Sequence, residues 1–149
     1  MTQLSYINKP IFDHGAIDQI SEILDDNGIK KPLVCTDSGL VKIGILDKVR
    51  NLISNQFTPI IFDKTPSNPT EASVMLALEK YHAESCDGII GLGGGSSIDL
   101  GKAVSIMVTH KGSLIDYSSN EGGSEKIKGT RVSNLPPCER NGRSNCKRS

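Results

Sequence analysis

The chain has 149 residues, which is enough for one α/β domain with a hydrophobic core and short for two. It carries 17 basic and 17 acidic residues and no Trp, so its composition argues against a nucleic-acid-binding surface or an anionic-membrane surface. No apolar run approaches the ~20 residues that span a bilayer, and the first residues lack the pattern of a secretory signal, so we expect a cytoplasmic protein without nucleic-acid or membrane partners.

The first half of the chain alternates between extended and helical patterns. Residues 4–7 and 11–14 flank Asn8-Lys9-Pro10, which favours a short N-terminal hairpin. A helical stripe follows from Ala16 to Leu24, and Gly28 is placed to end that helix as a left-handed cap. The next predicted elements are a strand at 32–36, a helix with apolar residues between 46 and 53, and a strand at 58–62.

A further helix start follows residue 67. Asn68 is expected to cap this helix, Pro69 suits its first turn, and Glu71 occupies the place of a capping-box acid. A strand at 87–92 and a helix at 98–108 complete the pattern. Because continuously apolar strands alternate with helices, we predict an α/β fold: a Rossmann-like, doubly wound parallel sheet covered on both faces.

The chain changes character near Tyr117. Residues 118–149 have little apolar periodicity and are rich in Gly, Ser, Asn, Lys and Arg. Such a segment cannot bury enough apolar surface to offset its ordering entropy. We therefore predict a dinucleotide-binding α/β domain at 1–117, no strand after the helix at 98–108, and a disordered tail at 118–149.

The most informative stretch joins the strand at 87–92 to the following helix. It runs through Gly93-Gly94-Gly95 directly into the helical pattern. Consecutive glycines cost backbone entropy unless a turn is tight or a ligand lies against the main chain. The N–H groups and the dipole at a helix start favour an anion such as phosphate. We also expect Ser96 and Asp99 to form a capping box, a role that does not compete with ligand binding.

Two known phosphate-binding motifs fit this turn incompletely. Gly91-x-Gly93-x-x-Ser96 nearly matches the Rossmann fingerprint, which expects an acid ~20 residues downstream. The convincing strand-tip acid instead lies upstream, at Asp37. The P-loop pattern requires Gly at position 96 and a hydroxyl at position 103, where the chain has Ser and Ala.

The segment Gly93–Asp99 with Lys102-Ala103 resembles the Gly-Gly-Gly-Ser-x-x-Asp-x-x-Lys-Ala signature of the iron-containing (group III) alcohol dehydrogenases. Residues 36–40, Thr-Asp-Ser-Gly-Leu, resemble the family's first strand tip, and Asn68-Pro69-Thr70 its Asn-Pro element. The resemblance covers residues 4–117. It implies an NAD(P)-binding N-terminal domain that works with a helical C-terminal domain carrying iron or zinc.

The resemblance also implies a set of cofactor-binding residues. Asp37 would lie near the adenosine ribose, where a carboxylate accepts hydrogen bonds from hydroxyls and repels a 2′-phosphate, so NAD is expected rather than NADP. Asn68 matches a cofactor-contacting position, although helix capping would explain it equally well. The full expected set is Asp37, Asn68, Gly94, Gly95, Ser96 and Asp99. Within this set, Gly95 and Ser96 would hold the pyrophosphate through backbone N–H groups and the serine hydroxyl.

The chain departs from the family in two respects. His14, His82 and His110 match none of its metal ligands, so we assign neither a metal ligand nor a catalytic residue. Where the family has a Pro-Thr-Thr-x-Gly-Thr-Gly loop, residues 138–142 would need a one-nucleotide frame shift to read Ala-Ser-Gly-Thr-Gly. We therefore interpret the tail as the result of a frameshift or a truncation.

These observations favour an NAD-dependent alcohol dehydrogenase acting on a small alcohol or aldehyde, represented by its cofactor half, inactive alone and compatible with a homo-oligomer. Two alternatives remain open: a non-catalytic nucleotide-binding fragment, and a lyase similar to dehydroquinate synthases. The run Ser96-Ser97-Ile98-Asp99 fits the dehydrogenase pattern better. The four cysteines form no C-x-x-C pair, which argues against a thiolate metal site, and Cys35 is expected to be a small buried hydrophobe.

Overall fold

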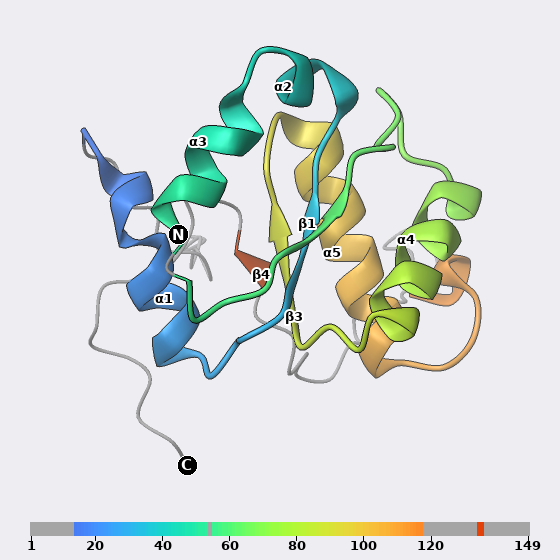
Figure 1. The fold of residues 1–149 in the computed structure, drawn as a ribbon. Coiled ribbons are helices and arrows are strands. Elements are labelled where there is room, and N and C mark those ends of the chain that lie inside the picture. The colour runs from blue at the N-terminus through green and yellow to red at the C-terminus, as the bar shows by residue number, and fades with distance from the viewer. Residues whose placement is uncertain (1–13, 54, 118–133, 136–149) are drawn as a thin grey trace, which may run out of the picture.

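The computed structural model describes residues 14–53, 55–117 and 134–135, and it contains a parallel sheet with the strand order β2-β1-β3-β4 (Figure 1). The strands are β1 (Pro32–Cys35), β2 (Ile60–Phe62), β3 (Gly88–Gly91) and β4 (Asn134–Leu135). The expectation that no strand follows the last long helix is wrong, because β4 pairs with β3. A strand of two residues is too short to produce a periodic sequence signal. The predicted N-terminal hairpin and the rest of the predicted tail lie outside the described residues.

Helices cover both faces of this sheet, as Figure 1 shows. One core cluster packs Leu33 and Cys35 of β1 under α4 and α5, and the other packs Val34 under α1 and α3. Alternate residues of a strand point to opposite faces, so β1 contributes to both layers. The predicted doubly wound α/β fold is confirmed. The helical elements are η1 (Ala16–Gln19), α1 (Ile20–Asp26), α2 (Ser38–Lys42), α3 (Ile45–Leu52), α4 (Glu71–Ala83), α5 (Gly95–Thr109) and η2 (Leu114–Tyr117).

The end of α1 agrees with the sequence-based prediction. Gly28 has φ +67°, and its amide donates to the carbonyl of Asp25 at 2.9 Å. The amide of Ile29 donates to the carbonyl of Leu24, also at 2.9 Å. This pair of hydrogen bonds is a Schellman motif, which satisfies the last carbonyls of the helix.

The predicted start of α4 at Asn68 is wrong by two residues. Thr70 is the N-cap, with its Oγ1 accepting from the amide of Ser73 at 3.3 Å and its own amide donating to Ser73 Oγ at 2.9 Å. Ser73 therefore fills the capping-box place that we expected Glu71 to fill. The short helix α2 was not predicted, because five residues give no periodic signal.

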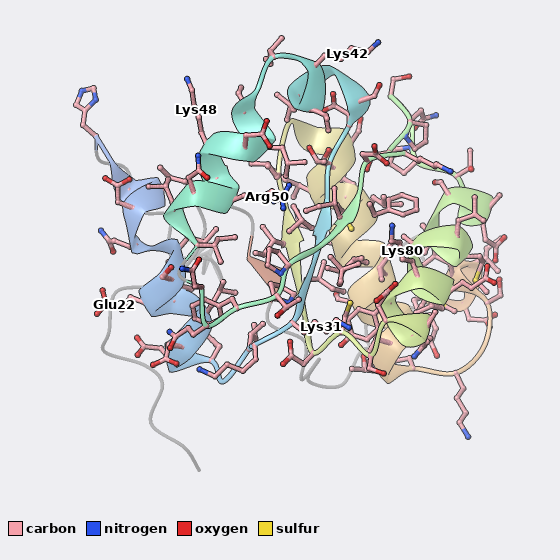
Figure 2. All side chains as sticks on the ribbon, in the orientation of Figure 1. Glu22, Lys31, Lys42, Lys48, Arg50 and Lys80 are labelled. Atoms are coloured by element: carbon pink, nitrogen blue, oxygen red, sulfur yellow. The ribbon has the colours of Figure 1, made fainter. Side chains whose placement is uncertain are left out.

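At the edge of the sheet where the strands begin, backbone amides donate to a side chain of the same chain. The carboxylate of Asp87 accepts from the amide of Lys30 at 2.8 Å and from that of Lys31 at 2.7 Å. The Lys31 ammonium, labelled in Figure 2, also lies 3.4 Å from Glu84 Oε2. These two amides therefore have acceptors within the chain and are not available to a ligand. The opposite edge, where the strands end, is considered next.

Gly101 lies on the side of α5 that faces β3. A Cβ atom there would lie 3.4 Å from Ile89 Cγ2 and 3.8 Å from Gly91 Cα. These are ordinary van der Waals distances, so the space at residue 101 would also admit an alanine. Among the described residues, no helix is long and apolar enough to cross a membrane.

Candidate functional site

The strand order creates a switch point between β1 and β3. The chain leaves β1 toward β2 on one side, and β4 lies on the other side of β3. In open α/β sheets, ligands bind in the crevice outside the carboxyl ends of the strands at such a point. Here β1 leads into Asp37 and β3 into the glycine turn, and the amide of Leu92 donates to the carbonyl of Cys35 at 2.8 Å.

Gly93 is required by the fold of the turn itself. Its φ is +142°, a conformation that residues with a side chain rarely adopt. A Cβ atom at this position would lie 2.9 Å from Ser97 Oγ, 3.0 Å from Leu40 Cδ1 and 3.3 Å from Asp37 Oδ2. One of the three glycines therefore has a purely structural explanation.

Gly94 and Gly95 have no such explanation. Gly94 has φ −76°, and a Cβ atom at either residue would meet nothing within 4 Å. Gly94 is the N-cap of α5 and has no side chain to cap the helix. The amides of Gly94, Gly95 and Ser96 donate to no other described residue. The turn therefore presents backbone donors to open space at a helix N-terminus, where an anion is stabilised.

The predicted capping box between Ser96 and Asp99 is wrong. Because Gly94 takes the N-cap place, Ser96 is the second residue of α5 and Asp99 the fifth. The Ser96 hydroxyl instead donates to the carbonyl of Ser67 at 2.6 Å. The side chain of Asp99 is 69% exposed, and its Oδ1 lies 3.9 Å from the Lys102 ammonium.

Asp37 has a structural task that we did not predict from the sequence. It is the N-cap of α2, and its Oδ1 accepts from the amides of Gly39 at 2.8 Å and Leu40 at 3.0 Å. The run Asp-Ser-Gly after a strand was the signal that could have revealed this cap. These bonds occupy one oxygen and orient the other, Oδ2, toward Gly93.

Asn68 lies in the loop between β2 and α4, next to the residue that Ser96 binds. Its side chain is exposed, and no described residue donates to it or accepts from it. Helix capping, which explained this asparagine as well as cofactor binding did, is excluded because Thr70 caps α4. The structure thus leaves its amide group available to a ligand at the carboxyl edge.

Two buried hydroxyls lie near this edge, and two thiols are buried in the core. Thr36 Oγ1 and Thr65 Oγ1 are enclosed and have no hydrogen-bond partner among the described residues. Burial raises the pKa of the Cys35 thiol to about 12, and burial is also the main cause that raises that of Cys86 to about 11. Both thiols are therefore protonated and unreactive near neutral pH, as expected for structural cysteines.

Two of the histidines lie at the far ends of α4 and α5, away from the glycine turn. His110 is the C-cap of α5, with Nδ1 3.1 Å from the carbonyl oxygen of Ile106. His82 is exposed on α4. In the part of the chain that the structure describes, no three His, Cys, Asp or Glu side chains gather to hold a metal ion.

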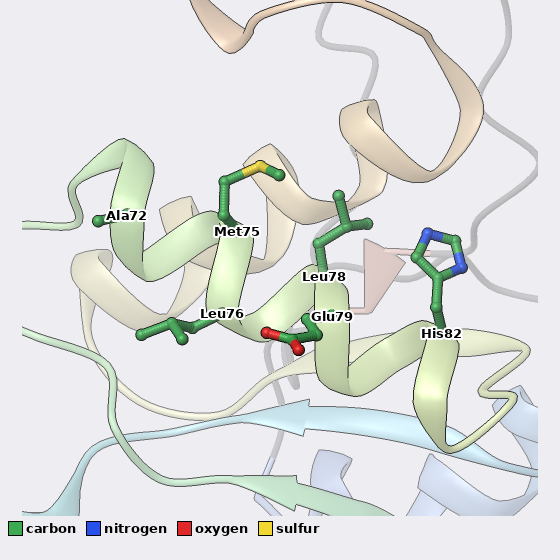
Figure 3. A pocket seen from close by; sticks show the side chains of 6 residues that line it. All are labelled: Ala72, Met75, Leu76, Leu78, Glu79 and His82. Carbon is green, nitrogen blue, oxygen red and sulfur yellow. The ribbon is translucent and has the colours of Figure 1, made fainter.

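A shallow apolar hollow lies along α4, separate from the glycine turn. Figure 3 shows Met75, Leu78 and His82 extending to one side of the helix, and Ala72, Leu76 and Glu79 complete its lining. All six residues belong to one helix, and only two of them carry polar side-chain groups. The hollow offers no cluster of donors comparable to the amides at the start of α5.

On the opposite layer, Figure 2 shows Lys42 and Lys48 extending outward from α2 and α3.

Comparison with known proteins gives a consistent result. The family model described as iron-containing alcohol dehydrogenase matches residues 8–136. The chain is 39% identical over 127 residues to the 4-hydroxybutyrate dehydrogenase of Cupriavidus necator, covering 85% of this chain and 33% of that protein. It is 30% identical to the NAD-dependent methanol dehydrogenase of Bacillus methanolicus, covering 78% of this chain and 31% of the relative.

Solved structures show the same similarity. A 1,3-propanediol oxidoreductase superposes with a TM-score of 0.72 at 34% identity, over 78% of this chain and 31% of that one. An iron-containing alcohol dehydrogenase superposes with a TM-score of 0.74 at 29% identity, over 90% of this chain and 36% of that one. The chain thus spans about a third of the length of the proteins it matches.

Proposed function

This chain belongs to the iron-containing alcohol dehydrogenase family, and from that premise we propose that it binds NAD at the carboxyl edge of its sheet. The relatives named above are oxidoreductases of alcohols, and this chain matches about a third of their length. Hydride transfer between an alcohol or aldehyde and nicotinamide is therefore proposed for the whole protein, and cofactor binding for this chain. The single observation that carries the proposal is the open pair Gly94 and Gly95 at the start of α5.

The glycine turn supplies the binding site for the diphosphate bridge in this proposal. The amides of Gly94, Gly95 and Ser96 donate to the phosphate oxygens, and the helix dipole of α5 favours their negative charge. Because neither conformation nor packing requires glycine at 94 and 95, close approach of a ligand is the remaining physical reason for both residues.

Asp37 and Asn68 flank the diphosphate site. The Oδ2 atom of Asp37 accepts hydrogen bonds from the adenosine ribose, and its negative charge disfavours the 2′-phosphate of NADP. Asn68 offers an exposed amide to the cofactor from the neighbouring loop. Asp99 lies four residues after Gly95 on α5 and acts from the cofactor side of that helix.

No residue of this chain is assigned to the chemical step. The bound nicotinamide supplies the hydride acceptor or donor. The described residues do not fit a divalent metal, because no set of three ligating side chains is brought together among them. We therefore derive no step through iron or zinc, and we expect the chain alone to show little or no turnover of small alcohols with NAD.

Isothermal titration calorimetry with NAD and NADP tests the proposal on the purified chain. We expect NAD to bind the wild type more tightly than NADP, and Gly95→Val to abolish NAD binding because its branched side chain fills the space above the amides. Ala83→Val is the matched control, since it adds a branched side chain to the exposed last residue of α4, near the start of β3.

The outcomes separate binding from folding. Thermal unfolding should show both valine variants folded, because a Cβ atom at residue 95 meets nothing within 4 Å. NAD binding that persists unchanged in a folded Gly95→Val protein would contradict the proposed site. Binding lost equally in Ala83→Val would contradict it as well.

A further inference from the structure

We propose that the Ser96 hydroxyl is a positioning group that docks the β2–α4 loop, and with it Asn68, onto the glycine turn. Its bond to the Ser67 carbonyl is 2.6 Å long and joins segments that are far apart in the sequence. The hydroxyl donates its only proton in this bond, so it is not available as a donor to phosphate. This inference rests on the proposed function and changes the role of one residue within it.

The loop is held at both of its ends by other contacts. At its start, the amide of Thr65 donates to the carbonyl of Thr36 at 3.2 Å. At its end, Thr70 is fixed by the reciprocal hydrogen bonds of the α4 capping box. Between these two anchors, the loop receives one hydrogen bond from another part of the described chain, and the donor is the Ser96 hydroxyl.

The position of the Ser96–Ser67 bond determines what it can control. It fixes the residue directly before Asn68, whose own side chain makes no hydrogen bond to a described residue. Without this bond, Asn68 would remain attached through Pro69 to the N-cap of α4 but would lose its link to the turn. The hydroxyl therefore places the asparagine beside the phosphate-binding amides before the cofactor arrives, which lowers the ordering cost of binding.

Limited proteolysis of the ligand-free chain tests this role independently of cofactor binding. Lys64 is exposed. Because a protease must bind several residues on both sides of the cleaved bond, we expect trypsin to cleave after Lys64 when the stretch up to Ser67 opens. A neutral hydrogen bond contributes about 1 kcal/mol, so we expect Ser96→Ala to raise the rate of cleavage at Lys64 about fivefold. Ser96→Thr retains the hydroxyl and should keep the wild-type rate.

Ser113→Ala is the matched control for the proteolysis. It removes another exposed serine hydrogen bond, the 3.0 Å contact from Ser113 Oγ to Glu71 Oε1, which reaches α4 and not the loop. It should leave cleavage at Lys64 unchanged. Equal cleavage rates in wild type and Ser96→Ala would overturn the proposal.

A double-mutant cycle on NAD affinity adds a second readout. If Ser96 acts through Asn68, Ser96→Ala should weaken NAD binding about fivefold in the wild-type background and hardly at all in an Asn68→Ala background. An equal loss in both backgrounds would assign the hydroxyl directly to the cofactor and overturn the positioning role. If the wild type binds no NAD, the proposed function fails, whereas the proteolysis still decides whether Ser96 docks the loop.

Discussion

The free carboxylate oxygen of Asp37 lies beside the α-carbon of Gly93, so closely that a Cβ atom on residue 93 would be 3.3 Å from Asp37 Oδ2. The two residues follow neighbouring strands, β1 and β3, at the switch point of the sheet. In the proposed function, this contact places the carboxylate for the ribose next to the turn for the diphosphate. The geometry of this pair depends on glycine at 93, whereas access to the turn depends on glycine at 94 and 95.

The first prediction separates these two requirements. We expect Gly93→Ala to lower the free energy of unfolding by about 1–3 kcal/mol, because its φ of +142° is strained for alanine and its Cβ would crowd Ser97 and Leu40. Gly94→Ala has an ordinary φ and open space, so its effect on stability should stay within about 0.5 kcal/mol. Urea denaturation of the two variants measures the difference, and equal losses would show that the turn is not built as described.

The second prediction concerns the two tasks of Asp37. Asp37→Asn keeps an oxygen that can cap α2 but removes the charge, so it should reduce the preference for NAD over NADP about tenfold at nearly unchanged stability. Asp37→Ala should change the preference similarly and also cost about 1 kcal/mol of stability through the lost cap. Calorimetry with both cofactors and urea denaturation check the two effects separately. Retention of the full NAD preference in Asp37→Asn would refute the charge argument.

Residue periodicity was sufficient to predict the layers of the fold. The predicted strands at 32–36 and 87–92 contain the runs Pro-Leu-Val-Cys and Gly-Ile-Ile-Gly, which do not alternate with polar residues. A strand buried on both faces requires this pattern, and β1 and β3 are these two runs. The triple glycine was visible in the sequence as one signal. The structure divides it into a conformational requirement at Gly93 and open positions at Gly94 and Gly95, a distinction that depends on φ angles and neighbours.

The helix starts were less predictable, because several residue types can cap a helix. Asn68 and Thr70 are both good N-caps, and the sequence offers no local reason to choose between them. The selection is made by Ser73, which completes the capping box with Thr70. In the same way, the Ser96 hydroxyl finds its acceptor in Ser67, on another element, so no sequence window around α5 contains its partner.

The last prediction tests the burial of Cys35. Cys35 is fully buried in β1, and this burial raises the pKa of its thiol from the ordinary value of 9.0 to about 12. Between pH 9 and 12 the unfolded chain therefore releases a proton that the folded chain retains. Since the folded state binds more protons in this window, stability falls as pH rises, by up to about 1.4 kcal/mol per pH unit from this group. Below pH 9 the contribution is fully present.

Comparison of the wild type with Cys35→Ala isolates this thiol. The substitution leaves a small cavity whose cost does not depend on pH, and other groups that titrate at high pH, such as Tyr81, are present in both proteins. The stability difference between the two proteins, measured by urea denaturation under reducing conditions, should be constant below pH 9 and should then shift steadily against the wild type. A difference that stays constant up to pH 11 would mean that the Cys35 thiol ionises as readily in the folded chain as in the unfolded one. In that case β1 would not be buried between the two helical layers.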